Sequence, residues 1–176
     1  MNDNLHFEIT LPTSCSRSEA RSLGAAAATC LRDAIGGRTE ILWPGHILLG
    51  EEELASVTCR VGEGSVLLTF DVSPAHASET LAMDVEKAVA GLAADFPANN
   101  AEIIQNYCNR CRTLMKFVDV VYRGMPVYGF AFAVDKHGGL MVMTQVSRTV
   151  ITVYSGEAVL AKDEPQQPDM PLMPRV

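Results

Sequence analysis

The sequence lacks features that would place the protein at a membrane, outside the cell or on nucleic acid. No apolar run approaches the roughly 20 residues that a helix needs to span a bilayer. The first residues include Asp3 and Glu8 and do not form the basic and then apolar pattern of a secretory signal. Lys and Arg number 14 against 21 Asp and Glu, which gives a net charge of -7 and too little basic surface to neutralise phosphates. We therefore expect a cytoplasmic protein that binds neither membranes nor nucleic acid.

Paired cysteines are also lacking. The five cysteines are an odd number at scattered positions, which argues against a disulfide framework. Cys108 and Cys111 have the spacing of half a zinc site, but no second half is evident in the sequence. The four histidines (His6, His46, His76 and His137) stand at no interval that would complete it. We expect no metal site, and we interpret these two cysteines as semi-buried thiols at a helix end.

The hydrophobic content is 48% of 176 residues, enough for one packed domain or two small ones. Apolar residues alternate over 5–11, which predicts a strand with one buried face. Ser16 and Glu19 form a capping-box pattern that predicts the start of a helix, and Gly36-Gly37 predicts its end. The next short β-type runs are 40–43, 54–60 and 65–72.

The second half of the chain has helix signals followed by several short β-type runs. Ser78 is a candidate cap for a second helix that must end before Pro97, and a third helix is predicted over 100–111. After it, short β-type runs at 117–122, 127–134, 140–144 and 150–154 have the spacing of a small antiparallel barrel. Residues 163–176 hold four prolines and no core-forming pattern, so we predict a disordered tail there.

Several short motifs occur in an order that can be compared with that of known families. The chain has Leu42-Trp43-Pro44-Gly45-His46-Ile47 and then Glu53-Leu54-Ala55-Ser56-Val57-Thr58. Later come Thr113-Leu114-Met115, Asp135-Lys136-His137-Gly138-Gly139-Leu140 and Ser155-Gly156-Glu157-Ala158. Over roughly 4–160, this order resembles the biotin protein ligase family. Its motifs are Lys-Trp-Pro-Asn-Asp-(Ile/Leu) and Lys-(Leu/Ile)-Ala-Gly-Ile-Leu, with Thr-Leu-Gly, Asp-x-x-Gly-x-Leu and (Ser/Ala)-Gly-Glu-Val in the terminal domain.

The resemblance implies an α+β fold. Residues 1–112 would form a truncated biotin/lipoate ligase-like (class II synthetase-like) domain, a mixed sheet with helices. Residues 113–162 would form a small SH3-like β-barrel, and 163–176 would be the disordered tail.

The chemistry implied by the family is a two-step ligation. The biotin carboxylate attacks the α-phosphate of ATP, and the adenylate then acylates a lysine of a carrier domain. Positive charge is essential because the first step brings anions together. The first motif lysine is Leu42 here, and the second is Glu53, which reverses the sign. Two unit charges about 4 Å apart interact by about 4 kcal/mol at an effective dielectric near 20, so a carboxylate there should repel an anionic ligand.

Other family positions also differ. The motif aspartate is replaced by His46 and the tight-packing glycine by Ser56. The family's Gly-x-Gly-(Ile/Val)-Asn run corresponds to 67–71, which ends at Asp71 and has neither glycine. The family's Gly-Arg-Gly-Arg-x-Gly-Arg loop has no counterpart in the sequence. We thus expect a degenerate pocket with no catalytic residue, formed by Leu42, Trp43, Pro44, His46, Glu53, Ser56 and Asp71.

Three functions follow from this pattern. The first is a pseudoenzyme or binding module that has lost ATP-dependent biotin adenylation and needs no cofactor; biotin and ATP would bind only if the family activity is retained. The second is one subunit of a split biotin/lipoate-protein ligase, whose second chain supplies the nucleotide-binding loop. The third is an enzyme of different chemistry that uses His46 with Glu53, or His137, although no complete catalytic set is legible. The partners expected are a second copy, a second ligase-like chain or a biotin carrier protein.

Overall fold

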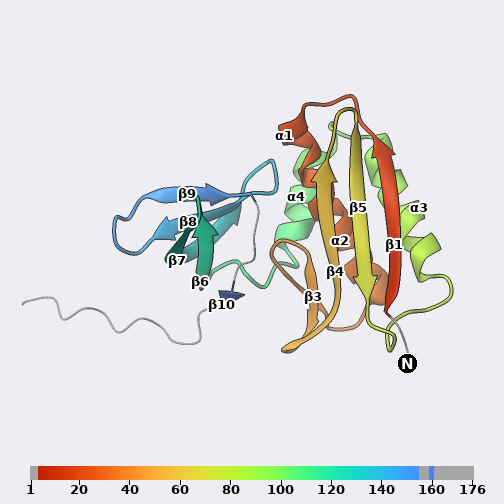
Figure 1. Cartoon of the computed structure of the whole chain (residues 1–176), viewed down its shortest axis with the longest axis horizontal. Coiled ribbons are helices and arrows are strands. Elements are labelled where there is room, and N and C mark those ends of the chain that lie inside the picture. The colour runs from red at the N-terminus through yellow and green to blue at the C-terminus, as the bar shows by residue number, and fades with distance from the viewer. Residues whose placement is uncertain (1–3, 155–158, 161–176) are drawn as a thin grey trace, which may run out of the picture.

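The structure is a computed structural model, and it describes residues 4–154 and 159–160 (Figure 1). Its first sheet has the strand order β1-β5-β4-β3-β2, and every pair of neighbouring strands is antiparallel. A mixed sheet was predicted, but the parallel part is limited to an isolated bridge between Ile41 and Cys111. The strands are β1 (Leu5–Pro12), β2 (Glu40–Leu42), β3 (His46–Leu49), β4 (Glu52–Val61) and β5 (Ser65–Val72).

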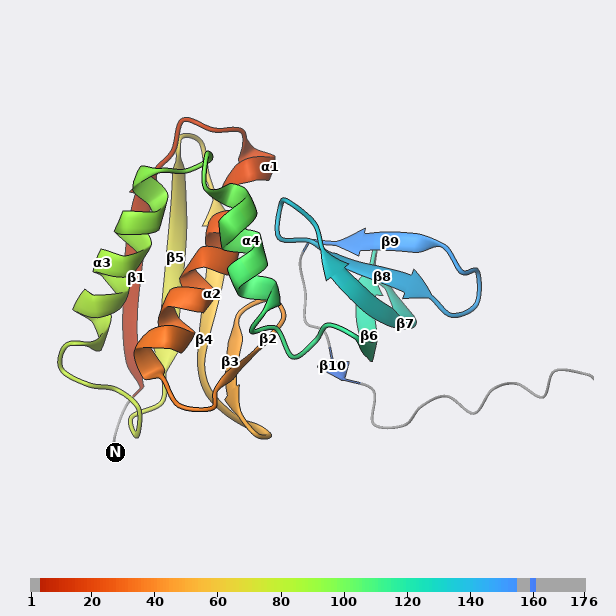
Figure 2. The same ribbon diagram turned by 180° about the vertical axis from the view of Figure 1, so that it is seen from behind.

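The helices cover one face of this sheet, as Figure 2 shows from behind. They are α1 (Arg17–Ala20), α2 (Ser22–Ile35), α3 (Leu81–Ala94) and α4 (Asn100–Cys108). Strand β5 shows the two faces clearly, because Leu68 and Phe70 are fully buried while Thr69 and Asp71 are only partly covered. Small side chains in α2, including Ala27 and Ala28, let the helix approach the sheet closely. The opposite face of the sheet is left open (Figure 1).

The second sheet has the order β10-β6-β7-β8-β9, again antiparallel. The SH3-like barrel predicted here is not confirmed, because the described strands form an open sheet with β9 and β10 at its edges. Strand β10 contributes only two residues and pairs only with β6, so the described strands do not close. The strands are β6 (Lys116–Tyr122), β7 (Met125–Val134), β8 (Leu140–Thr144), β9 (Val150–Val153) and β10 (Val159–Leu160).

Most of these elements were predicted from local sequence patterns. The capping box of Ser16 and Glu19 is present at the start of α1, and β5 covers the predicted range. Strand β3 was not predicted, because it is short and its pairing with β4 is irregular between Ile47 and Leu48. The predicted tail and the closing Ser155–Ala158 motif lie outside the described residues. No helix in the described part of the chain is long and apolar enough to cross a membrane.

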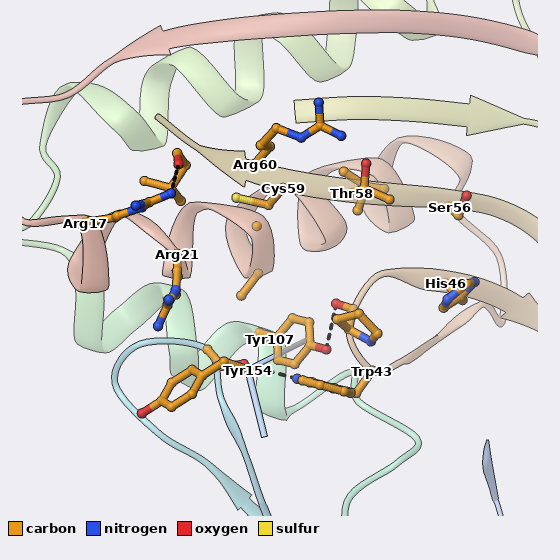
Figure 3. A pocket seen from close by; sticks show the side chains of 16 residues that line it. Arg17, Arg21, Trp43, His46, Ser56, Thr58, Cys59, Arg60, Tyr107 and Tyr154 are labelled. Atoms are coloured by element: carbon orange, nitrogen blue, oxygen red, sulfur yellow. Dashed lines mark hydrogen bonds between the residues drawn. The ribbon is translucent and has the colours of Figure 1, made fainter. Parts of the chain in front are cut away.

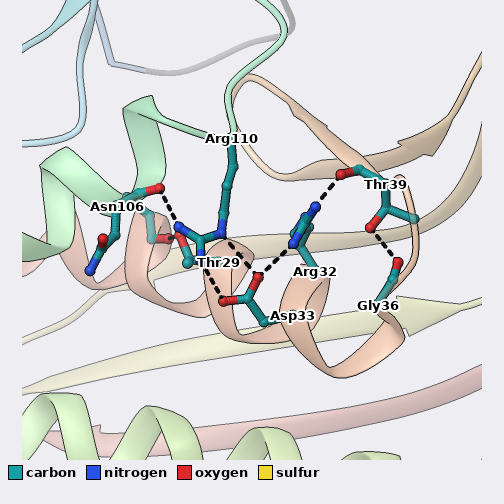
Figure 4. A network of polar contacts seen from close by, with 8 residues as sticks. Thr29, Arg32, Asp33, Gly36, Thr39, Asn106 and Arg110 are labelled. Atoms are coloured by element: carbon teal, nitrogen blue, oxygen red, sulfur yellow. Dashed lines mark hydrogen bonds and ion pairs between the residues drawn. The ribbon is translucent and has the colours of Figure 1, made fainter.

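A polar network fixes the end of α4 against α2 (Figure 4). The guanidinium of Arg110 donates to both carboxylate oxygens of Asp33, each at 3.0 Å, and to the carbonyl of Asn106 at 3.0 Å. The backbone on either side of Cys111 then pairs with Ile41, whose N–H donates to the Arg110 carbonyl at 2.9 Å. Strand β2, and the turn that follows it, are thus held by the end of α4.

Candidate functional site

The Trp43-Pro44 turn lies where the first sheet, α4 and the second sheet meet. Trp43 is 1% exposed, and its backbone N–H donates to the hydroxyl of Thr113 at 2.8 Å. Its indole N–H donates to the carbonyl of Gly138 at 3.1 Å, and the hydroxyl of Tyr107 donates to the carbonyl of Pro44 at 3.0 Å (Figure 3). The turn is therefore a structural junction, as expected of a core tryptophan.

Gly45 is required at its position by a close backbone approach. The N–H of Val57 donates to the carbonyl of Gly45 at 2.9 Å. A Cβ atom placed on Gly45 would lie 2.4 Å from the carbonyl oxygen of Val57, too close for any side chain. The family motif has asparagine here, so this turn cannot take the family residue without moving away from β4.

A cavity of about 570 Å³ runs along β4, from the α1–α2 boundary to the Trp43-Pro44 turn. Its floor is largely apolar and its rim carries arginines, which Figure 3 shows together with the other labelled side chains. No aspartate or glutamate is among the described residues that line it. The residues that line it include Arg17, Arg21, Trp43, Pro44, Val57, Cys59, Arg60, Tyr107 and Tyr154.

The arginines of this cavity have no carboxylate partner in the described part of the chain. Arg17 donates to the carbonyl of Val61 at 3.1 Å. The guanidinium of Arg21 lies 5.1 Å from the centre of the Tyr154 ring, a cation–π contact. Arg60 is exposed and lies on the other side of β4 from Arg21 (Figure 3). In a protein of net charge -7, three arginines around one cavity make it a candidate anion-binding site.

Three arginines outside the cavity make ion pairs. Arg32 and Arg110 pair with Asp33, and Arg112 pairs with Glu40 and Glu51. The ion-pair assignments in the described part of the chain include none for Arg38, Arg123 or Arg148, which lie outside the cavity. What distinguishes the cavity is that three such arginines line one space.

The predicted pocket residues divide into two groups. Trp43, Pro44, His46 and Ser56 line the cavity. The remaining three, Leu42, Glu53 and Asp71, are not among the residues that line it. Leu42 lies in β2 opposite His46. Oε1 of Glu53 lies 2.9 Å from Nδ1 of His46, and Asp71 pairs with His6 at 3.4 Å.

Strand register brings some of these residues into one row on the open face of the sheet. His46 pairs with Ser56, Ser56 with Asp71, and their side chains point to the same side because paired residues share a face. Ser56 thus stands beside a histidine whose other ring nitrogen contacts a carboxylate, in the order of a nucleophile, base and orienting group. No hydrogen bond joins Ser56 to His46 among the described residues, whereas His46 Nδ1 lies 2.9 Å from Glu53 Oε1.

Sequence reasoning missed the cavity arginines, because they lie outside the family motifs. Arg17 and Arg21 are four residues apart, a spacing that places side chains on one helical face. Arg21 joins α1 to α2 and keeps a helical backbone, with φ -61° and ψ -32°. That spacing could have suggested a cationic helix face. Its position beside β4 and Tyr154 depends on pairings and packing that the sequence does not show.

The cysteines do not form a metal site in the part of the chain that the structure describes, where no group of three or more His, Cys, Asp or Glu is suitably placed. Burial raises the pKa of the Cys30 and Cys59 thiols to about 11. Burial is also the main cause of the raised pKa values of Cys108 and Cys111. Such thiols are protonated near neutral pH and are poor ligands and nucleophiles.

Comparisons with known proteins show the fold. No family model matches the sequence, and no curated protein matches it. The apo biotin protein ligase of Aquifex aeolicus matches with a TM-score of 0.66 and 13% identity, over 91% of this chain and 83% of that one. The same enzyme in complex with biotin and ATP matches with a TM-score of 0.64 and 13% identity, over 91% and 79%. A biotin protein ligase-like protein of unknown function from Silicibacter sp. TM1040 matches with a TM-score of 0.72 and 10% identity, over 87% and 79%. The resemblance found in the motifs is confirmed at the level of the fold.

Proposed function

We propose that this chain is a binding module built on the biotin protein ligase fold, which binds an anionic ligand in the arginine-lined cavity and does not adenylate it. One observation carries the proposal: Arg17, Arg21 and Arg60 surround a cavity that no described carboxylate lines. The apolar floor suits a ligand with a nonpolar body and a carboxylate at one end. A hydrogen bond to a charged group contributes about 1.5–3 kcal/mol, so two arginines can anchor such a ligand.

Loss of adenylation is supported by the positions that carry the family's lysines. Both lysine positions have lost their positive charge. Leu42 is uncharged, and Glu53 carries a carboxylate that lies 2.9 Å from His46. Gly45 holds the turn against β4, where the family's asparagine would collide with Val57. The Aquifex aeolicus enzyme is known in complex with biotin and ATP, and we propose that this chain has kept the scaffold without the triphosphate chemistry.

Ligand binding is testable with octanoate as the probe, because it joins a carboxylate to an apolar chain. Trp43 is the single tryptophan and lines the cavity, so its fluorescence reports binding directly. We expect a saturable change that weakens at least tenfold in the double variant Arg17→Gln/Arg21→Gln. Arg38→Gln is the matched control, since Arg38 is exposed and lies outside the cavity. No saturable change, or equal weakening by both changes, would overturn the proposal.

The absence of adenylation is tested separately. The protein is incubated with biotin, ATP and Mg²⁺, and the products are analysed by mass spectrometry. We expect no biotinyl-adenylate above the level of a protein-free mixture. Formation of the adenylate by the purified chain would contradict a non-adenylating module.

A second candidate is one subunit of a split biotin/lipoate-protein ligase. Strand β1 favours it, because β1 is an edge of the first sheet and its outer side pairs with no described strand. A second ligase-like chain, or a second copy, could extend the sheet there. Purification of the tagged protein from its native source should then recover a chain with a Gly/Arg-rich loop in equal amount, and repeated recovery of the tagged protein alone would count against the split enzyme.

A further inference from the structure

We infer that the anionic ligand is an acidic peptide segment in an extended conformation, which adds as a strand to the unpaired edge of β4. The inference rests on the proposed function and names the class of ligand. Strand addition to an exposed edge is a common way to bind peptides, since the main chain supplies the hydrogen bonds and side chains supply selectivity.

The edge of β4 is unpaired because β3 pairs with only part of β4. Strand β3 begins at His46, which pairs with Ser56, so the pairing covers only the first half of β4. The N–H of Val57 still donates to Gly45. Beyond Val57, no described strand pairs with β4 on this side, and the space beside it is the arginine-lined cavity. Figure 3 shows β4 crossing the cavity with its edge toward Trp43 and Tyr107.

The hydrogen-bond pattern shows which backbone groups face the cavity. At the β4–β5 turn, the N–H of Gly62 donates to the carbonyl of Ser65 at 2.9 Å. In an antiparallel ladder such pairs alternate, so the N–H and carbonyl groups of every second residue of β4, counted back from Gly62, point toward β5. The N–H and carbonyl groups of Val57, Cys59 and Val61 therefore point away from β5, toward the cavity. Two contacts agree: Val57 reaches Gly45, and Arg17 reaches the carbonyl of Val61.

Cys59 lies between Val57, whose N–H has a partner, and Val61, whose carbonyl has one. By the alternation, its N–H and carbonyl face the cavity, and no contact among the described residues accounts for them. An incoming strand would supply both partners, as neighbouring strands do elsewhere in the sheet. At about 3.3 Å per residue, the distance from Val57 to Val61 is about 13 Å, which accommodates roughly four residues of an extended peptide.

Charge determines the kind of peptide. Arg17 and Arg21 lie at the helical end of the edge, while Arg60 projects on the other side of β4 (Figure 3). An added strand presents its side chains alternately to the two sides, so acidic residues in either register meet an arginine. A basic peptide would find no carboxylate among the described lining residues. The cavity thus selects an acidic strand.

The test uses the full chain and the peptide acetyl-Thr-Glu-Val-Asp-Val-Thr-amide. Its control carries N-methyl groups on alternate residues, which removes main-chain donors and keeps every charge. We expect saturable binding, at least tenfold weaker for the methylated peptide and for Arg17→Gln/Arg21→Gln, and unchanged for Arg38→Gln. In hydrogen exchange, the N–H of Cys59 should become at least tenfold more protected when the peptide is bound. Equal binding of both peptides, or no added protection at Cys59, would overturn strand addition.

Comparing octanoate binding with peptide binding tests the strand-addition inference separately from the proposed function. If octanoate binds in an arginine-dependent way and the peptide does not bind, the inference is wrong and the proposed function stands. If neither probe binds, both are wrong. Peptide binding that displaces octanoate supports both.

Discussion

The indole N–H of Trp43 donates to the carbonyl oxygen of Gly138 at 3.1 Å, across 95 residues of sequence. This bond links the turn after β2 to the turn between β7 and β8. The same second turn is held from α4 by Asn100, whose side-chain amide donates to the Lys136 carbonyl at 2.8 Å. The second sheet is thus fixed beside the cavity, and Tyr154 next to Arg21 forms part of its wall.

Trp43→Phe removes this hydrogen bond and part of a buried ring. We expect the free energy of unfolding to fall by about 1–3 kcal/mol, from a lost hydrogen bond and a new void. Urea unfolding measures it, and amide exchange in residues 135–139 should accelerate. Tyr122→Phe is the control, because that hydroxyl makes no hydrogen bond in the described part. Equal stability of Trp43→Phe and wild type would show that the junction contributes little.

Gly45→Ala tests the close approach of the turn to β4. The added Cβ would meet the Val57 carbonyl, a backbone atom that cannot move alone, so we expect a loss of about 1–3 kcal/mol. Gly91→Ala in α3 is the matched control, because a Cβ there meets nothing within 4 Å. That change should stabilise the helix by about 0.5–1 kcal/mol. The same sign for both variants would contradict the packing described at Gly45.

Leu42→Lys restores the first lysine of the family motif. We expect no biotinyl-adenylate by mass spectrometry, because Glu53 and His46 still occupy the neighbouring motif positions. The triple change Leu42→Lys/His46→Asp/Glu53→Lys serves as the comparison, and it should also fail while Gly45 keeps its contact with Val57. Adenylate formed by the single variant would show that the site is only one substitution from activity.

The Cys59 thiol should react slowly in the native protein. Burial raises its pKa from an ordinary value of 9.0 to about 11. Two pKa units reduce the thiolate fraction at pH 8 about 100-fold. The protein is treated with a pulse of iodoacetamide and analysed by peptide mass spectrometry. Labelling of Cys59 in the native protein should be at least about 100-fold slower than in the urea-unfolded protein. Similar rates in both states would contradict the raised pKa of this thiol.

The same shifts predict a dependence of stability on alkaline pH. Cys30 and Cys59 have folded-state pKa values of about 11, above the ordinary value of 9.0, so the folded state holds their protons more tightly. Their contribution is complete below pH 9 and is lost as the pH rises through 11. The free energy of unfolding should therefore fall over this window, and less steeply in Cys30→Ala/Cys59→Ala. An identical slope in the double variant would contradict the assignment to these thiols.

Several features of the fold could be predicted from local sequence. The capping box at Ser16 and Glu19 sets the start of α1 because it satisfies backbone donors within four residues. Alternation over 65–72 sets β5, since a half-buried strand needs a period of two. The barrel was the weaker prediction, because closure depends on pairing between distant strands, and regular spacing of short β-type runs is equally compatible with an open sheet.

The motifs at Leu42 and Glu53 determined, from sequence alone, that two lysines of the biotin protein ligase pattern are replaced. The location of positive charge was decided only by tertiary structure. Arg17 and Arg21 come from a helix start, Arg60 comes from a strand, and no sequence interval relates the helix pair to the strand. They line one cavity because the pairing of β3 with β4 begins at Ser56 and leaves the rest of the β4 edge open. A strand's neighbours are set by non-local pairing and packing, which local patterns do not encode.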